Sequence, residues 1–202
     1  MKHSGQTSRK PDVAPRERIL EAARELFYLR GIRAVTVDEI AAAARTNKMT
    51  LYRHFTSKDL LVAEYLRSFV AYGRTRFEKA VRTHPGDAYA QLRAYVAMIG
   101  DDFGQSYVRG CPMANAAVEL PDKDHPARVV IEESKREHRA AIFKLCREAR
   151  FVKPKRLTDE IYLLFEGASV DIQTSGKFGP GARFSQLALA LMNSHSRHSD
   201  SK

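Results

Sequence analysis

The chain has 202 residues, of which 44% are hydrophobic and 29% charged, and its formal net charge at pH 7 is +10. This composition is typical of a globular protein with one large or two small domains, and the sequence has no run of 18 apolar residues that could form a membrane-spanning helix. The two cysteines, Cys111 and Cys146, are too few for a disulfide scaffold and form no CxxC pair of the kind found in structural zinc sites.

The positive charge is denser near the N-terminus. Residues 1–60 contain 12 Lys/Arg against 7 Asp/Glu, whereas the much longer stretch 61–202 contains 22 against 17. A local excess of cations is expected of a phosphate-binding module. Residues 1–15 are predicted to be a disordered basic arm, with contacts from Arg9 and Lys10 to DNA as the alternative. They contain no apolar segment of the signal-peptide kind, so a cytoplasmic location is expected.

The first predicted helix covers residues 16–30. Ile19, Ala23 and Phe27 recur on one face at helical spacing, and Gly31 suits the C-terminal cap. This helix is expected to support the two short helices that follow it.

Two short helices joined by a tight corner are predicted between residues 36 and 58. Thr36 and Glu39 have the spacing of a capping box at the start of the first. Either Thr46 or Asn47 can begin the second, which runs from residue 48 to about 54. The second helix is expected to bury Leu51 and to expose a polar, cationic face that suits a groove in nucleic acid.

The rest of the chain also reads as helical, and no strand alternation is visible. Further helices are predicted over residues 58–82, 87–103, 112–119, from 125 or 126 to 150, 156–175 and 182–193. The sequence therefore predicts an all-α fold of about nine helices. It divides into a basic arm (1–15), a domain whose exposed cationic helix suits nucleic acid (16–60), a larger helical domain (61–195) and a disordered tail (196–202).

Residues 16–66 resemble the helix-turn-helix domain of TetR-family transcriptional regulators. Thr50-Leu51-Tyr52-Arg53-His54-Phe55, followed by Ser57-Lys58, matches the third helix of that family and its link to a long fourth helix. The chain departs from the pattern at Arg45, where the family commonly has glycine, and at Met49, where a small residue is usual. A left-handed conformation at Arg45 would cost roughly 1–2 kcal/mol.

The resemblance implies a homodimer that binds double-stranded operator DNA, and it assigns contacts to the helix-turn-helix. Five residues should face bases or the groove wall, and three should hold phosphates, with Thr46 at the corner between them. The predicted DNA-contacting residues are Lys48, Met49, Thr50, Arg53 and His54 for the groove, Thr36, Tyr52 and Lys58 for phosphates, and Thr46.

The last two predicted helices are rich in Leu, Phe and Ala. The resemblance implies that such a pair forms a four-helix bundle with its twofold mate, and the alternative is that both helices belong to the internal core. The residues predicted to form the dimer interface are Ile161, Leu164, Ala168, Ile172, Phe184, Leu187 and Leu191.

The resemblance also implies a small-molecule effector held in the C-terminal domain. Side chains with a polar tip or a large apolar body are the candidates for the pocket. They are Tyr89, Arg93, Met98, Phe103, Tyr107, Cys111, Met113, Asn115, Phe143, Tyr162 and Phe165. Cys111 supports an alternative function, a redox or electrophile sensor, because a thiol at a helix N-terminus beside Arg109 is reactive.

An enzyme is not expected. The seven histidines are scattered without metal-site spacing, and there is no phosphate-binding glycine loop or Gly-x-Ser-x-Gly elbow. The adjacent carboxylates Asp101-Asp102 and Glu132-Glu133 are interpreted as solvated. The predicted function is a ligand-responsive transcriptional regulator, more specifically a repressor, that uses no cofactor or metal.

Overall fold

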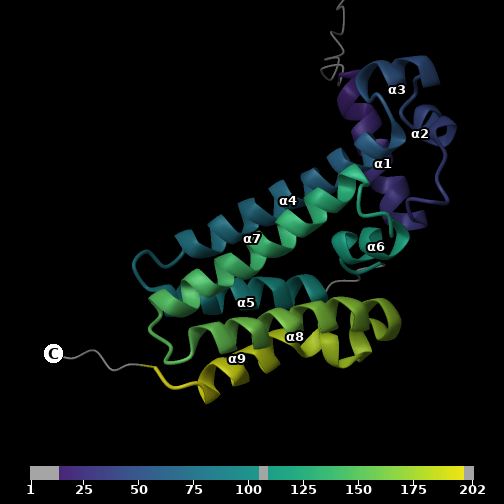
Figure 1. The fold of residues 1–202 in the computed structure, drawn as a ribbon. Coiled ribbons are helices and arrows are strands. Elements are labelled where there is room, and N and C mark those ends of the chain that lie inside the picture. The colour runs from purple at the N-terminus through teal and green to yellow at the C-terminus, as the bar shows by residue number, and fades with distance from the viewer. Residues whose placement is uncertain (1–13, 105–108, 198–202) are drawn as a thin grey trace, which may run out of the picture. The chain divides into compact units, whose positions relative to one another are not determined.

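The computed structural model describes residues 14–104 and 109–197, which form an all-α protein (Figure 1). This confirms the predicted fold class, with nine α-helices in the described residues. The helices are α1 Pro15–Arg30, α2 Val37–Ala43, α3 Lys48–His54, α4 Lys58–Arg82, α5 Ala88–Gly104, α6 Pro112–Glu119, α7 Pro126–Glu148, α8 Pro154–Ser175 and α9 Phe184–Ser194. None of these helices is long and apolar enough to cross a membrane.

The chain forms two compact units that meet between Tyr65 and Leu66, inside α4. The sequence placed the boundary five residues earlier, near the start of the same helix. A helix that belongs to two units gives no sequence signal at the point where its packing partners change.

In the second unit, α5, α7, α8 and α9 surround one apolar core (Figure 1). Leu92, Ile142 and Leu157 are almost completely buried there. The close approach of α5 and α9 depends on Gly100, because a Cβ at that position would lie 2.5 Å from the Cβ of Ser185. Burial of such apolar side chains is the main stabilising contribution of this unit.

Two helix starts in the second unit differ from the sequence prediction. Helix α8 begins at Pro154 rather than residue 156, because proline lacks an N–H and fits the first position of a helix. Helix α9 begins at Phe184, because the 3-10 turns Gly176–Phe178 and Pro180–Arg183 occupy the preceding residues.

In the first unit, α1 packs against both α2 and α3. Ile19, Ile40 and Leu51 are completely buried at the centre of this three-helix head. The ring of Phe27 meets that of Tyr65 edge-on, with 5.5 Å between their centroids. Burying a side chain of this size contributes about 1.5–3 kcal/mol, so the burial of Leu51 holds α3 on the head.

The corner between α2 and α3 is closed by two backbone hydrogen bonds. The amide of Arg45 donates to the carbonyl of Ala42 (3.0 Å), and that of Thr46 donates to Ala41 (2.9 Å). This is the Schellman pattern, which needs a left-handed residue after the helix. Arg45 fills that position with φ 51, so an arginine adopts the left-handed conformation at the corner where the resembled family commonly has glycine. Helix α7 ends in the same way at Arg150, with φ 58.

We expect Arg45→Gly to raise the free energy of unfolding, measured by urea denaturation, by about 0.5–1 kcal/mol. Glycine avoids the Cβ clash of about 1–2 kcal/mol in the left-handed region, although it loses more backbone entropy on folding. Arg45→Ala is the control, because it removes the charge and keeps the clash, and it should not stabilise the protein. An equal gain in both variants would assign the effect to charge instead of backbone conformation.

Candidate functional site

Helix α3 presents a polar and cationic face to solvent. Lys48, Tyr52, Arg53 and His54 are exposed, and Met49 is 74% exposed. The buried side of the helix is held by Leu51 and, directly after it, Phe55, as the sequence predicts. Because the apolar anchor fixes one side, the other side is a rigid, exposed surface with several hydrogen-bond donors.

Asn47 begins α3 as its N-cap. Its side-chain oxygen accepts a hydrogen bond from the backbone N–H of Thr50 (2.8 Å). This decides between the two caps that the sequence left open. Thr46 lies half-buried in the corner, where its backbone N–H closes the Schellman motif. The cap fixes the point at which the exposed face of α3 begins.

The predicted capping box at the start of α2 is present. Glu39 accepts hydrogen bonds from both the backbone N–H and the hydroxyl of Thr36 (both 2.8 Å), and it forms an ion pair with Arg30 (2.7 Å). The backbone hydrogen bond from Thr36, followed by that from Arg30, lowers the pKa of Glu39 to about 2. A phosphate contact from the Thr36 hydroxyl would therefore compete with an ionised carboxylate.

Two of the predicted cationic contacts already have partners inside the head. Lys48 forms an ion pair with Asp38 (3.2 Å) in which both side chains are exposed. Such pairs are worth about 0–1 kcal/mol, so Lys48 is easily released to another anion. Lys58 donates to the backbone carbonyl of Ile32 (2.7 Å), which ties α4 to the segment before α2.

Arg45, which departs from the family pattern at the corner, is also an exposed cation and was not among the predicted DNA contacts. It lies three residues before Lys48, at the entry to α3. A basic residue at the turn of a helix pair was the available signal, because turns beside a groove-binding helix are placed to reach the phosphate backbone.

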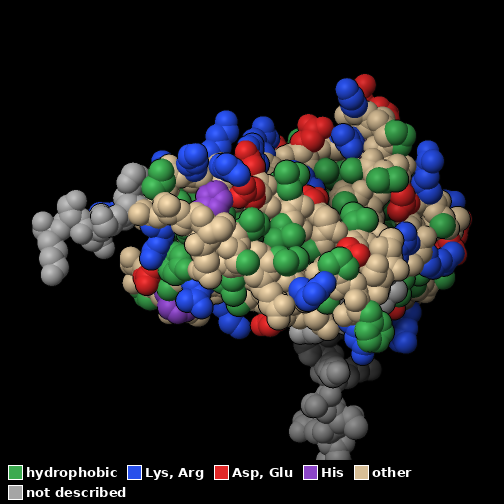
Figure 2. Space-filling model, turned by 90° about the horizontal axis from the view of Figure 1, so that it is seen from below, with side chains coloured by type: hydrophobic (Ala, Val, Ile, Leu, Met, Phe, Trp, Pro, Cys, Tyr) green, Lys and Arg blue, Asp and Glu red, His purple; other side chains and the backbone are tan. Residues whose placement is uncertain are grey.

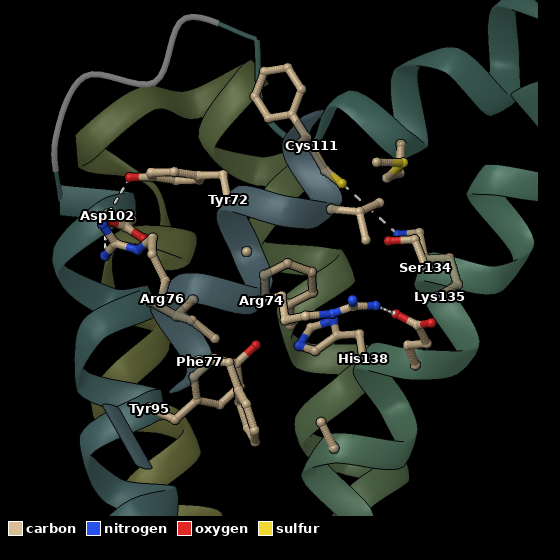
Figure 3. A pocket seen from close by; sticks show the side chains of 18 of the residues that line it. Tyr72, Arg74, Arg76, Phe77, Tyr95, Asp102, Cys111, Ser134, Lys135 and His138 are labelled. Atoms are coloured by element: carbon tan, nitrogen blue, oxygen red, sulfur yellow. Dashed lines mark hydrogen bonds and ion pairs between the residues drawn. The ribbon is translucent and has the colours of Figure 1, made fainter. Parts of the chain in front are cut away.

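The second unit contains a pocket of about 500 Å³ (Figure 3). Its lining comes mainly from α4, α5 and α7, with contributions from α6 and α8. A volume of 300–1,000 Å³ is the usual range for small-molecule sites. The structure brings four of the predicted pocket residues together around it, namely Met98, Cys111, Met113 and Phe165.

Six other predicted residues do not line this pocket. Phe103 packs in the core against Phe165 and Phe184, Tyr89 bonds to Asn193, and Asn115 donates to the carbonyl of Arg109. The remaining three lie elsewhere in the unit: Arg93 beside the Tyr89 ring, Phe143 half-buried on α7, and Tyr162 beside the His138 ring. Tyr107 falls outside the described residues.

The polar side of the pocket was missed at the sequence level. Arg76 of α4 forms an ion pair with Asp102 of α5 (2.7 Å) and donates to the Tyr72 hydroxyl (3.0 Å). Asp102 is therefore half-buried rather than solvated as predicted, and its pKa is raised by burial, against the opposing effect of Arg76. The signal that could have found this side is the mixed aromatic and basic run of α4 after residue 69.

His138 of α7 lies within a ring of aromatic side chains. The centroid of its ring is 4.7 Å from that of Phe165 and 6.0 Å from that of Tyr95, both edge-on. Burial, and secondarily the charge of Lys135, lowers the pKa of His138 to about 4. The imidazole is therefore neutral at physiological pH, with one nitrogen as donor and the other as acceptor.

Cys111 lies half-buried at the edge of the same pocket. The ammonium of Lys135 is 4.0 Å from its sulfur and also contacts the carboxylate of Glu166 (2.5 Å). Cys111 is the N-cap of α6, as predicted, although its side chain makes no capping hydrogen bond. Cys146, in contrast, is completely buried in the core.

The dimer interface stays a prediction, and the structure shows where the residues named for it lie within the single chain. Four of the predicted residues, Ile161, Ala168, Ile172 and Phe184, are buried in the core of the single chain. They are on the richest apolar stripe of α8 and α9, and that stripe faces the chain's own helices. Leu164 and Leu191 are half-buried against the same core, and Leu187 is partly exposed.

A second, sparser apolar stripe of α8 faces solvent. Leu163 is 67% exposed and Val170 is 54% exposed, and the exposed Gly167 lies between them at helical spacing. Figure 2 shows hydrophobic side chains across the face that α8 and α9 form. Nothing lies within 4 Å of a Cβ built on Gly167, so another helix can approach α8 closely there.

A known protein family matches residues of the first unit. The family described as bacterial regulatory proteins, tetR family, matches residues 19–65. The HTH-type transcriptional repressor KstR2 of Rhodococcus jostii is 47% identical over 55 residues, 27% of each chain. KstR2 of Mycobacterium tuberculosis is 41% identical over 66 residues, 33% of each chain. The matched segments thus span a third or less of these relatives.

A solved structure extends the likeness to both units. The structure of SCO4454, a TetR-family transcriptional regulator from Streptomyces coelicolor, superposes with a TM-score of 0.79. The two sequences are 28% identical, and the match covers 89% of this chain and 92% of SCO4454.

Proposed function

We propose that this chain, which belongs to the TetR family of bacterial regulatory proteins, is a repressor that binds a palindromic operator as a homodimer and releases it on binding a small molecule. The family match and the named homologues support a DNA-binding transcriptional regulator. One observation carries the proposal. The residues that match the family, 19–65, belong to the head, and the head presents α3.

The exposed face of α3 supports docking in the major groove. Arg53, His54 and Met49 extend from this face, and Arg and His can bond to base edges while Met makes apolar contacts. Lys48 and Thr50 complete the groove-facing set. Thr36, Thr46, Tyr52 and Lys58 are assigned to phosphates, whose contacts position a helix without reading sequence. The exposed Arg45 joins this second group.

The exposed stripe of α8 supports a twofold dimer. Leu163, Gly167 and Val170 form an apolar surface with a small residue at its centre, which suits the close packing of an identical helix. Two heads related by a twofold axis match two half-sites about one helical turn of DNA apart. We assign the effector site of this regulator to the pocket in the second unit.

The exposed face of α3 should recognise a specific DNA sequence. Mobility-shift selection from genomic fragments at near-physiological salt should recover one palindromic site. On that site, Lys48→Ala and Arg53→Ala should each weaken binding by about 1–3 kcal/mol if they read bases. The control is Arg82→Ala, at the far end of α4, which should bind like the wild type. Binding that is weak, independent of sequence and lost on adding salt would contradict the proposal.

The exposed stripe of α8 should hold the dimer together. A Leu163→Glu, Val170→Glu double variant should sediment as a monomer, because two carboxylates would be buried against their symmetry mates without partners. It should also lose operator affinity, since one head binds only one half-site. Val118→Glu is the matched control, because Val118 is 84% exposed on α6 and outside this stripe. A double variant that remains dimeric would place the interface elsewhere.

A second candidate function, an electrophile sensor, is favoured by the position of Cys111. Its sulfur lines the pocket, 4.0 Å from the ammonium of Lys135. Addition of this thiol across the double bond of N-ethylmaleimide would form a C–S bond from the sulfur, and the thiol proton would be replaced by one delivered from solvent to the adjacent carbon.

We expect alkylation to release operator DNA in the wild type and to have no such effect in Cys111→Ser. The buried Cys146 serves as an internal control, because mass spectrometry should find it unmodified in the folded protein. DNA binding that survives complete alkylation of Cys111 would exclude this mode of sensing.

A further inference from the structure

The pocket combines aromatic walls with charges that are already paired. Each cation in its lining has a carboxylate partner: Arg74 with Glu137 (2.9 Å), Arg76 with Asp102 (2.7 Å) and Lys135 with Glu166 (2.5 Å). An anionic ligand would have to displace one of these carboxylates, and a cationic ligand would have to displace an Arg or Lys. The lining therefore favours a molecule without net charge.

The shape of the walls favours flat rings. Phe69, Phe77, Tyr95 and Phe165 all line the pocket, and Phe77 and Tyr95 meet edge-on with 5.0 Å between their centroids. Aromatic side chains prefer edge-to-face and offset contacts with other rings. A fused-ring molecule offers both a face and edges to such walls.

His138 supplies a polar group that this pocket leaves unused. Its Nε2 atom is buried and has no hydrogen-bond partner among the described residues. The ring lies on the α7 side of the pocket in Figure 3, across from Tyr95 of α5. A buried nitrogen without a partner costs free energy that a ligand can recover by bonding to it.

We propose that the pocket binds a neutral, fused-ring aromatic alcohol whose hydroxyl group bonds to Nε2 of His138. A hydroxyl group can donate to an imidazole nitrogen or accept from it, so it fits whichever nitrogen carries the proton. A carbonyl oxygen fits only one tautomer, and a hydrocarbon leaves Nε2 unsatisfied. The inference names the effector class of the regulator proposed above and therefore rests on that function, although its test uses the protein without DNA.

Three probes of similar size separate these contributions. 2-Naphthol carries the hydroxyl group, 2-methylnaphthalene replaces it with a methyl group, and 2-naphthoate replaces it with an anion. Isothermal titration of the full chain at pH 7 should show 2-naphthol binding about five- to tenfold more tightly than 2-methylnaphthalene, the value of one neutral hydrogen bond. 2-Naphthoate should bind at least about tenfold more weakly than 2-naphthol.

Variants of His138 test its role directly. His138→Phe should abolish the preference for 2-naphthol while retaining 2-methylnaphthalene, which also shows that the pocket is folded. His138→Gln, whose amide can bond to a hydroxyl group, should restore part of the preference. His84→Phe is the matched control, since His84 is exposed and outside the pocket, and it should bind all three probes like the wild type.

The outcomes separate this inference from the proposed function. Tighter binding of 2-naphthoate, equal binding of 2-naphthol by His138→Phe, or no binding of any probe would overturn the inference, and operator binding measured on the same protein would be unaffected. A His138-dependent preference for 2-naphthol would support the inference even if operator DNA were not released, in which case only the ligand-response part of the proposed function would fail.

Discussion

The burial of two apolar side chains, Leu51 and Phe55, determines how the head presents the exposed face of α3. Helix α3 has only seven residues, and an isolated helix of that length is not stable in water. Leu51 and Phe55 hold it against the rest of the head, and both are almost fully buried. The Schellman corner at Arg45 and the Asn47 cap then fix where the helix starts. The exposed face of α3 is rigid because these constraints act on the opposite side and at the entry.

The local features of the head were predictable because neighbouring residues determine them. The capping box at Thr36 and Glu39 and the anchor at Leu51 depend on spacings of a few residues, which a sequence displays directly. The left-handed conformation of Arg45 was raised in a different way, by the family resemblance, which commonly has glycine at that corner. The sequence could not decide between Asn47 and Thr46 as the N-cap of α3, because that choice depends on the length of the corner.

The pocket and the exposed face of α8 were harder to predict from the sequence, because each depends on which side of a helix packs against another element. His138 and Arg76 come from helices about 60 residues apart, and nothing in either helix alone indicates that they share a cavity. On α8, the richest apolar stripe packs inside the chain, as Ile161 and Ile172 show. The exposed stripe of Leu163 and Val170 is sparser, so a count of apolar residues does not reveal that α8 has a second apolar face toward solvent.

A response of the head to a ligand needs an element that belongs to both units, and α4 has that property. It is continuous from Lys58 to Arg82, and the boundary between the units falls within it. Leu61 and Val62 are buried near its start, while Arg76 and Phe77 line the pocket further along. The ion pair of Arg76 with Asp102 therefore links the lining of the pocket to a helix that contributes residues to both units.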